Sequence, residues 1–208
     1  MKKLKYGLFF GDSITYGEYD FIYGGWVDIL KRYALKKFQK GSDELILFNL
    51  GIGGETTKGL INRISPELSA RNAEGGNFVF LSYGANDLAQ KEGFYQVNSL
   101  EFENNILNAI KIARAYTQEI FLVSILPVSN LVDGVLLGSG KIRTNVDVLS
   151  YNDILKKIAK KENLEYIDFH KLFFEDKEFL LSKDGVHPNE KGYELMANHV
   201  ISIIDSFF

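Results

Sequence analysis

The sequence predicts an α/β fold in which a parallel β-sheet is covered by helices on both faces. Short apolar segments of strand length alternate along the chain with longer amphipathic segments of helix length. Most of the short segments are continuously apolar, which is typical of strands that are buried on both faces. Repeated strand–helix units of this kind favour a parallel sheet between two layers of helices.

Five strands and five helices are expected, and they alternate along the chain. The expected strands are residues 4–10, 45–50, 78–83, 120–126 and 165–169. The expected helices are residues 26–38, 57–68, 100–116, 146–161 and 190–204. The last helix has the clearest period, because Tyr193, Met196 and Val200 fall on one face.

Composition indicates an ordinary globular chain, and we expect residues 1–208 to form one domain. Hydrophobic residues make up 46% of the 208 positions and charged residues 25%, and no linker divides the chain. A formal net charge of -3 provides no basic field, so no nucleic-acid partner is expected. The absence of cysteine excludes disulfides and thiol catalysis.

The amino terminus imitates the start of a signal peptide, since Met1, Lys2 and Lys3 precede an apolar run. That run is short, and it ends in Gly11 and Asp12 instead of a cleavage site. A buried strand is the better interpretation. No stretch is long and apolar enough to span a bilayer, so we expect an unexported, cytoplasmic protein.

One long segment, residues 129–145, has no periodic pattern and contains Gly134, Gly138 and Gly140. Loops of this length on compact domains are more often functional than decorative. The sequence leaves three roles open for it: a lid, a pocket wall, or a mobile connection.

Polar, glycine-bearing segments follow the expected strands. They are residues 11–17, 49–56, 84–87 and, before the last helix, 184–188. In open α/β sheets, ligands bind beyond the carboxyl ends of the strands. We therefore expect these segments to meet at one edge of the sheet and to form the functional site.

The residue types in these segments point to nucleophilic catalysis. Ser13 can act as a nucleophile if His187 removes its proton and Asp184 holds the histidine ring. The backbone N–H groups of Ser13 and Gly54 and the side-chain amide of Asn86 are candidate oxyanion donors. This chemistry needs no metal and no cofactor. The sequence contains neither the Gly-x-Ser-x-Gly elbow of standard α/β-hydrolases nor a dinucleotide or P-loop motif.

The four blocks resemble those of the SGNH (GDSL-type) esterases and lipases. The resemblance rests on Gly-Asp-Ser at 11–13, the glycine block at 49–56, Gly-Ala-Asn-Asp at 84–87 and Asp-Gly-Val-His-Pro at 184–188. It implies a flavodoxin-like three-layer α/β/α sandwich with strand order 2-1-3-4-5. It also implies Ser13 as nucleophile, Gly54 and Asn86 in the oxyanion hole, and Asp184 with His187. Members hydrolyse carboxylic esters or thioesters, and some deacetylate carbohydrates or transfer acyl groups.

Several alternatives stay open. A carbohydrate O-deacetylase or an acyltransferase would use the same residues, and a binding domain without turnover would keep only the scaffold. Ser13 also suits a helix N-cap. Six residues in loops at the expected edge are candidates for contacting a small-molecule ester substrate, although ordinary packing explains them too. They are Tyr16, Tyr19, Phe94, Tyr95, Leu131 and Val135.

Overall fold

The sheet of the protein has five parallel strands, as a computed structural model that describes residues 4–208 shows. Met1, Lys2 and Lys3, on which the signal-peptide comparison depends, lie outside the described residues. The strand order is β2-β1-β3-β6-β7, which confirms the predicted order 2-1-3-4-5. The strands are β1 (Leu4–Gly11), β2 (Glu44–Gly51), β3 (Asn77–Ser82), β6 (Ile120–Val123) and β7 (Glu165–Ile167).

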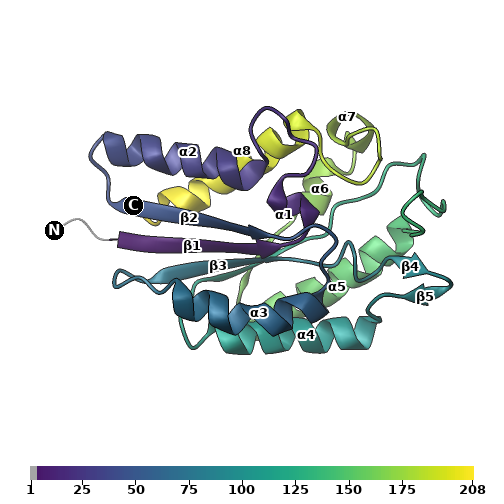
Figure 1. Cartoon of the computed structure of the whole chain (residues 1–208), viewed down its shortest axis with the longest axis horizontal. Helices are drawn as coiled ribbons and strands as arrows, with labels where there is room; N and C mark the ends of the chain where they lie inside the picture. The colour runs from purple at the N-terminus through teal and green to yellow at the C-terminus, as the bar shows by residue number, and fades with distance from the viewer. Residues whose placement is uncertain (1–3) are drawn as a thin grey trace.

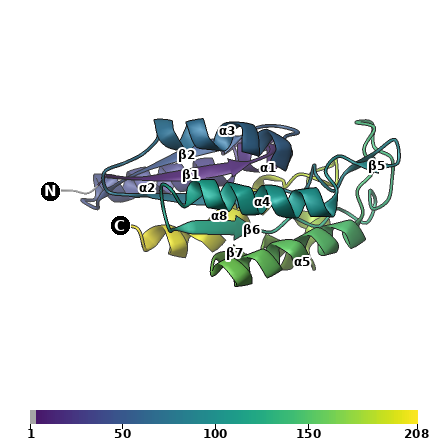
Figure 2. The ribbon, with the colours of Figure 1, turned by 90° about the horizontal axis from the view of Figure 1, so that it is seen from below.

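Helices form a layer on each side of this sheet, which confirms the three-layer arrangement (Figures 1 and 2). One layer holds α2 (Trp26–Gln39) and α8 (Glu190–Asp205). The other layer holds α3 (Thr57–Ala70), α4 (Ser99–Ala113) and α5 (Asn145–Glu162). Each of these five helices overlaps a segment that the sequence predicted to be helical.

The two core layers explain why the strands are continuously apolar. Leu8 and Phe10 in β1 belong to the apolar core cluster that lies between the sheet and helices α3, α4 and α5. Phe9, between them, packs against Trp26 in the cluster of α2 and α8. Because successive side chains of a strand point to opposite faces, both sets must be apolar when both faces are covered.

Two strands, β6 and β7, end two or more residues earlier than predicted because other groups satisfy their backbone. After β6, the amide N–H and carbonyl of Ile125 bond to the side chain of Asn152 in α5, at 2.8 and 2.9 Å. After β7, Asp168 caps the short helix α6 (Phe169–Phe173). At these positions the backbone forms its hydrogen bonds with a side chain or within a helix, and no longer with a neighbouring strand.

Five short elements were not predicted, since they are too short to show a period. They are α1 (Ser13–Tyr16), β4 (Gln90–Lys91), β5 (Phe94–Tyr95), α6 and α7 (Lys177–Leu180). The β4–β5 hairpin forms its own two-stranded sheet. It lies with α1 toward the end of the molecule to which β1 points (Figure 1).

Strand register brings the predicted functional segments to one edge. Gly11, the last residue of β1, pairs with Gly51 of β2 and with Ser82 of β3. The three strands therefore end at one level, and the segments that follow them leave the sheet side by side. Within residues 4–208, no helix is both long and apolar enough to cross a membrane.

Candidate active site

Ser13 stands at the start of α1, directly beyond the end of β1. The side chain of Asp12 caps this turn by accepting a 3.0 Å hydrogen bond from the amide of Ile14. Gly17 closes the turn in the left-handed region, at φ 97°, and its N–H bonds to the carbonyl of Ser13. Gly51 lets β2 approach this turn, because a Cβ there would lie 2.2 Å from the backbone nitrogen of Tyr16. Ser13 is thereby held on a rigid turn at the sheet edge.

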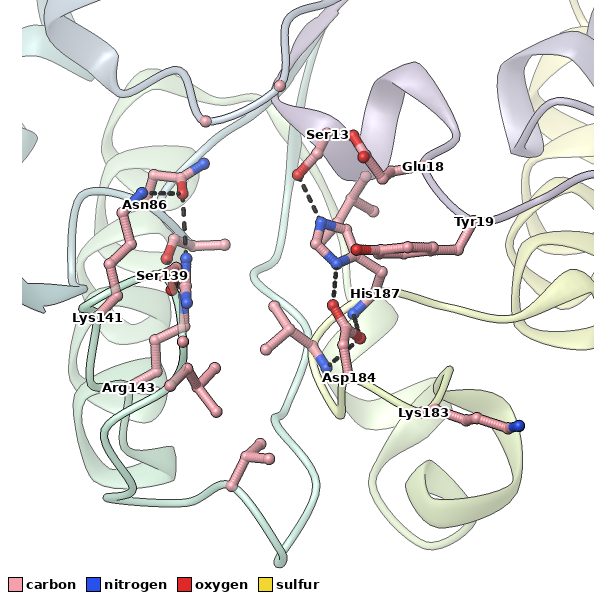
Figure 3. A pocket seen from close by; sticks show the side chains of 18 residues that line it. Ser13, Glu18, Tyr19, Asn86, Ser139, Lys141, Arg143, Lys183, Asp184 and His187 are labelled. Atoms are coloured by element: carbon pink, nitrogen blue, oxygen red, sulfur yellow. Dashed lines mark hydrogen bonds and ion pairs between the residues drawn. The ribbon is translucent and has the colours of Figure 1, made fainter.

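His187 and Asp184 meet Ser13 from the loop before α8 (Figure 3). The hydroxyl oxygen of Ser13 lies 2.7 Å from His187 Nε2, and His187 Nδ1 lies 2.5 Å from Asp184 Oδ2. The other carboxylate oxygen of Asp184 accepts the backbone N–H groups of Val186 and His187 and the hydroxyl of Ser182. One carboxylate therefore shapes the loop and orients the imidazole.

Hydrogen bonding keeps Asp184 ionised. Burial alone would raise the pKa of its carboxyl, but the bonds from His187, the Val186 amide and Ser182 hold that pKa far below the ordinary value. The ring of Tyr19 lies edge-on to the His187 imidazole, with the ring centroids 5.1 Å apart. These contacts keep the Asp184 carboxylate ionised and hold the plane of the His187 ring.

Gly54 and Asn86 line the same cleft as Ser13. Gly54 has φ 75°, a conformation that glycine adopts without strain. The neighbouring Glu55 anchors this loop through a bidentate ion pair with Arg63 and a 2.6 Å bond from the Tyr83 hydroxyl.

The Asn86 side chain joins this loop to the nucleophile turn. Its Nδ2 donates to the carbonyl of Glu55 at 3.2 Å and, weakly, to Asp12 Oδ2 at 3.4 Å. Its Oδ1 accepts from Lys141 Nζ and from Arg143, each at 3.1 Å. The amide nitrogen therefore faces the Ser13 side of the cleft, while the amide oxygen faces the two cations.

Two buried aspartates flank these residues. Burial raises the pKa of Asp12 to about 6, although the Ile14 amide and the charges of His187 and Arg143 oppose that rise. Burial likewise raises the pKa of Asp87 to about 6. Oδ1 of Asp87 accepts both the N–H and the hydroxyl of Thr57, the first residue of α3. Asp87 thus ties the Asn86 segment to a helix.

The cleft around Ser13 has a volume of about 620 Å³ and mixed polar and apolar walls. Figure 3 shows His187 and Asp184 on one side and Asn86, Lys141 and Arg143 on the other. Part of the predicted irregular segment 129–145 forms one wall. The residues it contributes are Val132, Leu137, Gly138, Ser139, Lys141 and Arg143.

Among the predicted substrate contacts, only Tyr19 lines this cleft. Tyr16 lines a neighbouring cavity together with Gly17 and Asn49. Four others lie outside the lining and are exposed: Phe94, Tyr95, Leu131 and Val135. The hydroxyl of Tyr95 donates a 2.7 Å hydrogen bond to Asp147 at the start of α5.

Sequence reasoning did not single out Lys141 and Arg143. The only available signal was their position in the glycine-bearing segment 129–145, because neither residue belongs to a recognisable motif. Among residues 4–208, no three His, Cys, Asp or Glu side chains cluster in a way that would hold a metal ion.

Comparisons with known proteins give matches over most of the chain. The model of the GDSL-like lipase/acylhydrolase family matches residues 9–195. An isoamyl acetate-hydrolyzing esterase from Saccharomyces cerevisiae is 27% identical over 216 residues, which cover 97% of this chain and 86% of the yeast protein.

Solved structures of similar fold cover nearly the whole chain. A member of the lipolytic G-D-S-L family from Veillonella parvula has a TM-score of 0.75 and 26% identity, covering 97% of this chain and 98% of that one. A lipase/acylhydrolase from Enterococcus faecalis has a TM-score of 0.77. At 22% identity, with 97% and 96% of the two chains covered, that second likeness is one of fold.

Proposed function

The chain belongs to the GDSL-like lipase/acylhydrolase family, and we propose that it is a serine esterase that hydrolyses small carboxylic esters through an acyl-enzyme on Ser13. The whole chain would act as one catalytic domain, with no cofactor. The observation that carries the proposal is the continuous contact from the Ser13 hydroxyl through His187 to Asp184, at 2.7 and 2.5 Å. A serine that served only as a helix cap would not need a histidine at this distance.

In the first step, Ser13 Oγ attacks the ester carbonyl carbon while His187 Nε2 takes the hydroxyl proton. Asp184, which is kept ionised by its hydrogen bonds, stabilises the imidazolium that forms. The carbonyl oxygen becomes an oxyanion. The backbone N–H groups of Ser13 and Gly54 and the amide nitrogen of Asn86 would donate to it.

Collapse of this intermediate breaks the bond to the alcohol oxygen, which leaves with the proton from His187. Water then attacks the acyl group on Ser13 and gives a proton to His187. The second collapse releases the carboxylic acid and returns the proton to Ser13 Oγ. Each bond that forms is matched by one that breaks, so no further reactant is needed.

The cleft supports a small substrate. Its volume of about 620 Å³ lies within the range of small-molecule sites. The yeast relative is described by the hydrolysis of isoamyl acetate, an ester with a short acyl group. The polar side chains on the walls, such as Glu18, Ser139 and Lys141, also favour the alternative of a carbohydrate O-deacetylase.

The test is hydrolysis of aryl esters of increasing acyl length by the wild type and by Ser13→Ala. We expect turnover to be fastest with the shortest chains and kcat to fall by roughly 10⁴- to 10⁶-fold in Ser13→Ala. Ser139→Ala is the matched control, since it removes a hydroxyl from the same cleft that does not contact His187. Retained turnover in Ser13→Ala would remove Ser13 from the mechanism. Turnover only with acetylated sugars, or only with an added alcohol acceptor, would favour the deacetylase or the acyltransferase.

A further inference from the structure

Two cations from the 129–145 segment converge on a single atom, the amide oxygen of Asn86. Lys141 Nζ and Arg143 each donate to this oxygen at 3.1 Å (Figure 3). Arg143 also donates through Nε to the carbonyl of Ala85 at 2.7 Å. The guanidinium therefore donates hydrogen bonds to both Asn86 and Ala85.

The backbone around Arg143 is held on both sides. Ile142 exchanges two 2.9 Å hydrogen bonds with Gln90, and the carbonyl of Arg143 accepts the N–H of Gly134 at 2.8 Å. Thr144 then caps α5 by accepting the amide of Asp147. These hydrogen bonds hold the backbone of Arg143 in place, so its side chain extends to Asn86 from a fixed position.

Arg143 is 8% exposed, and a charge so deeply buried is normally paired. None of the ion pairs within residues 4–208 includes Arg143 or Lys141. Burial lowers the pKa of Arg143, although the more distant carboxylates of Asp12 and Asp184 oppose that fall. Burial together with the charge of Arg143 lowers the pKa of Lys141. Placing two like charges together is unfavourable, which calls for a functional explanation.

The cations determine which way the Asn86 amide faces. Lysine and arginine only donate hydrogen bonds, so the amide oxygen must point to them. A flipped amide would set its NH₂ group against two donors, so Asn86 would offer no acceptor to either cation. In the observed orientation the NH₂ group points to Glu55 and, across 3.4 Å, to the Asp12 carboxylate beside Ser13.

The same arrangement polarises the amide. Positive charge lies at its oxygen end and the Asp12 carboxylate lies at its nitrogen end, so both draw electrons toward the oxygen. An N–H group in such a field is a stronger donor to a developing negative charge. The weak 3.4 Å bond to Asp12 is the one that an oxyanion would most easily replace.

We propose that Arg143, assisted by Lys141, is a positioning residue that locks and polarises the Asn86 amide as a donor to the oxyanion. This role rests on the proposed esterase function. Because the oxyanion exists only in the transition state and intermediate, the loss of Arg143 should lower kcat and leave KM nearly unchanged.

The test is a double-mutant cycle with a neutral aryl acetate. We expect Arg143→Met to lower kcat roughly tenfold to a hundredfold, which is less than the 10²- to 10³-fold typical for loss of an oxyanion donor. Asn86→Ala should show that larger loss, and adding Arg143→Met to it should cost little more, because the arginine acts through the asparagine. Lys141→Met, at a half-buried site, repeats the comparison if Arg143→Met is unstable. Lys91→Met is the control, since it removes a nearby charge that does not contact Asn86.

If the decreases in kcat of the two single variants multiplied in the double variant, the two residues would act independently. That result, or a change confined to KM, would overturn the proposal in favour of direct substrate contact by Arg143.

A second measurement does not depend on turnover. The side-chain NH₂ resonances of Asn86, identified by their loss in Asn86→Ala, should shift in Arg143→Met and stay in place in Lys91→Met. Unshifted resonances in Arg143→Met would refute the positioning role even if the protein hydrolyses no ester. Absence of Ser13-dependent hydrolysis together with a shift would instead contradict only the proposed function.

Discussion

The substitution Asp184→Asn separates the two roles of this carboxylate, which are to shape the loop and to orient the His187 ring. In the wild type, Oδ1 of Asp184 accepts from Ser182, Val186 and His187, while Oδ2 contacts His187 Nδ1 at 2.5 Å. The asparagine carbonyl can keep the three Oδ1 bonds. Its NH₂ group then faces His187 Nδ1 and can only donate, so Nδ1 must become the acceptor and Nε2 must carry the ring proton. A protonated Nε2 cannot take the proton of Ser13.

The size of the effect follows from that tautomer and from the lost negative charge. In serine hydrolases with this constellation, the same substitution lowers kcat by about 10⁴-fold, or about 5.5 kcal/mol in activation free energy. We expect a loss of about 10³- to 10⁴-fold here. The fold should survive, because the three hydrogen bonds that shape the loop remain.

Steady-state hydrolysis of an aryl acetate measures kcat and KM, and circular dichroism checks the fold. Ser182→Ala is the matched control, because it removes one Oδ1 contact and leaves the bond from Oδ2 to His187 intact. That control should lose less than about tenfold, as expected for one neutral hydrogen bond. If a folded Asp184→Asn variant kept its kcat within tenfold of the wild type, Asp184 would not be orienting the base.

Two further predictions concern stability. The pKa of Asp87 is about 6 in the folded protein against 3.8 ordinarily, so the folded state holds its proton more tightly. This carboxyl alone should lower stability by about 3 kcal/mol at most as pH rises from about 4 to 6, and Asp12 has the same shift. Asp87→Asn should therefore reduce the slope of stability against pH in urea unfolding and leave the part due to Asp12, and an unchanged slope would contradict the assignment. Gly51→Ala should cost about 1–3 kcal/mol, because the added Cβ would meet the Tyr16 backbone nitrogen at 2.2 Å. Gly53→Ala is the control, because a Cβ there would lie no closer than 3.6 Å to its nearest atom, a Glu18 oxygen. Equal thermal stability of the two variants would show that the close approach of Gly51 to Tyr16 is unimportant.

The burial of the sheet between two helix layers was predictable from local patterns, whereas its strand order was implied by the family resemblance. Continuous apolar strands such as β1 can be buried on both faces only between two helix layers, and the structure confirms this. The ends of β6 and β7 were less predictable. They depend on Asn152 and Asp168, whose hydrogen bonds cannot be recognised before α5 and α6 are placed.

The candidate site was predictable where it consists of segments that directly follow strands. Ser13 and Asn86 follow β1 and β3, whose register brings their ends together. Lys141 and Arg143 were not predictable, because their position depends on pairing between Ile142 and the distant Gln90. Leu131 and Val135 share the same segment, yet both side chains are exposed, so membership of the loop alone did not identify the side chains that face the cleft.

The most direct test of the account is covalent labelling by a fluorophosphonate, which reacts with a serine only where a neighbouring base activates it. Mass spectrometry of the digested protein locates the adduct. We predict one adduct per chain, on the peptide that contains Ser13, with none in Ser13→Ala and much slower labelling in His187→Ala. An adduct on another residue, or no adduct in a wild-type protein that hydrolyses esters, would contradict Ser13 as the nucleophile.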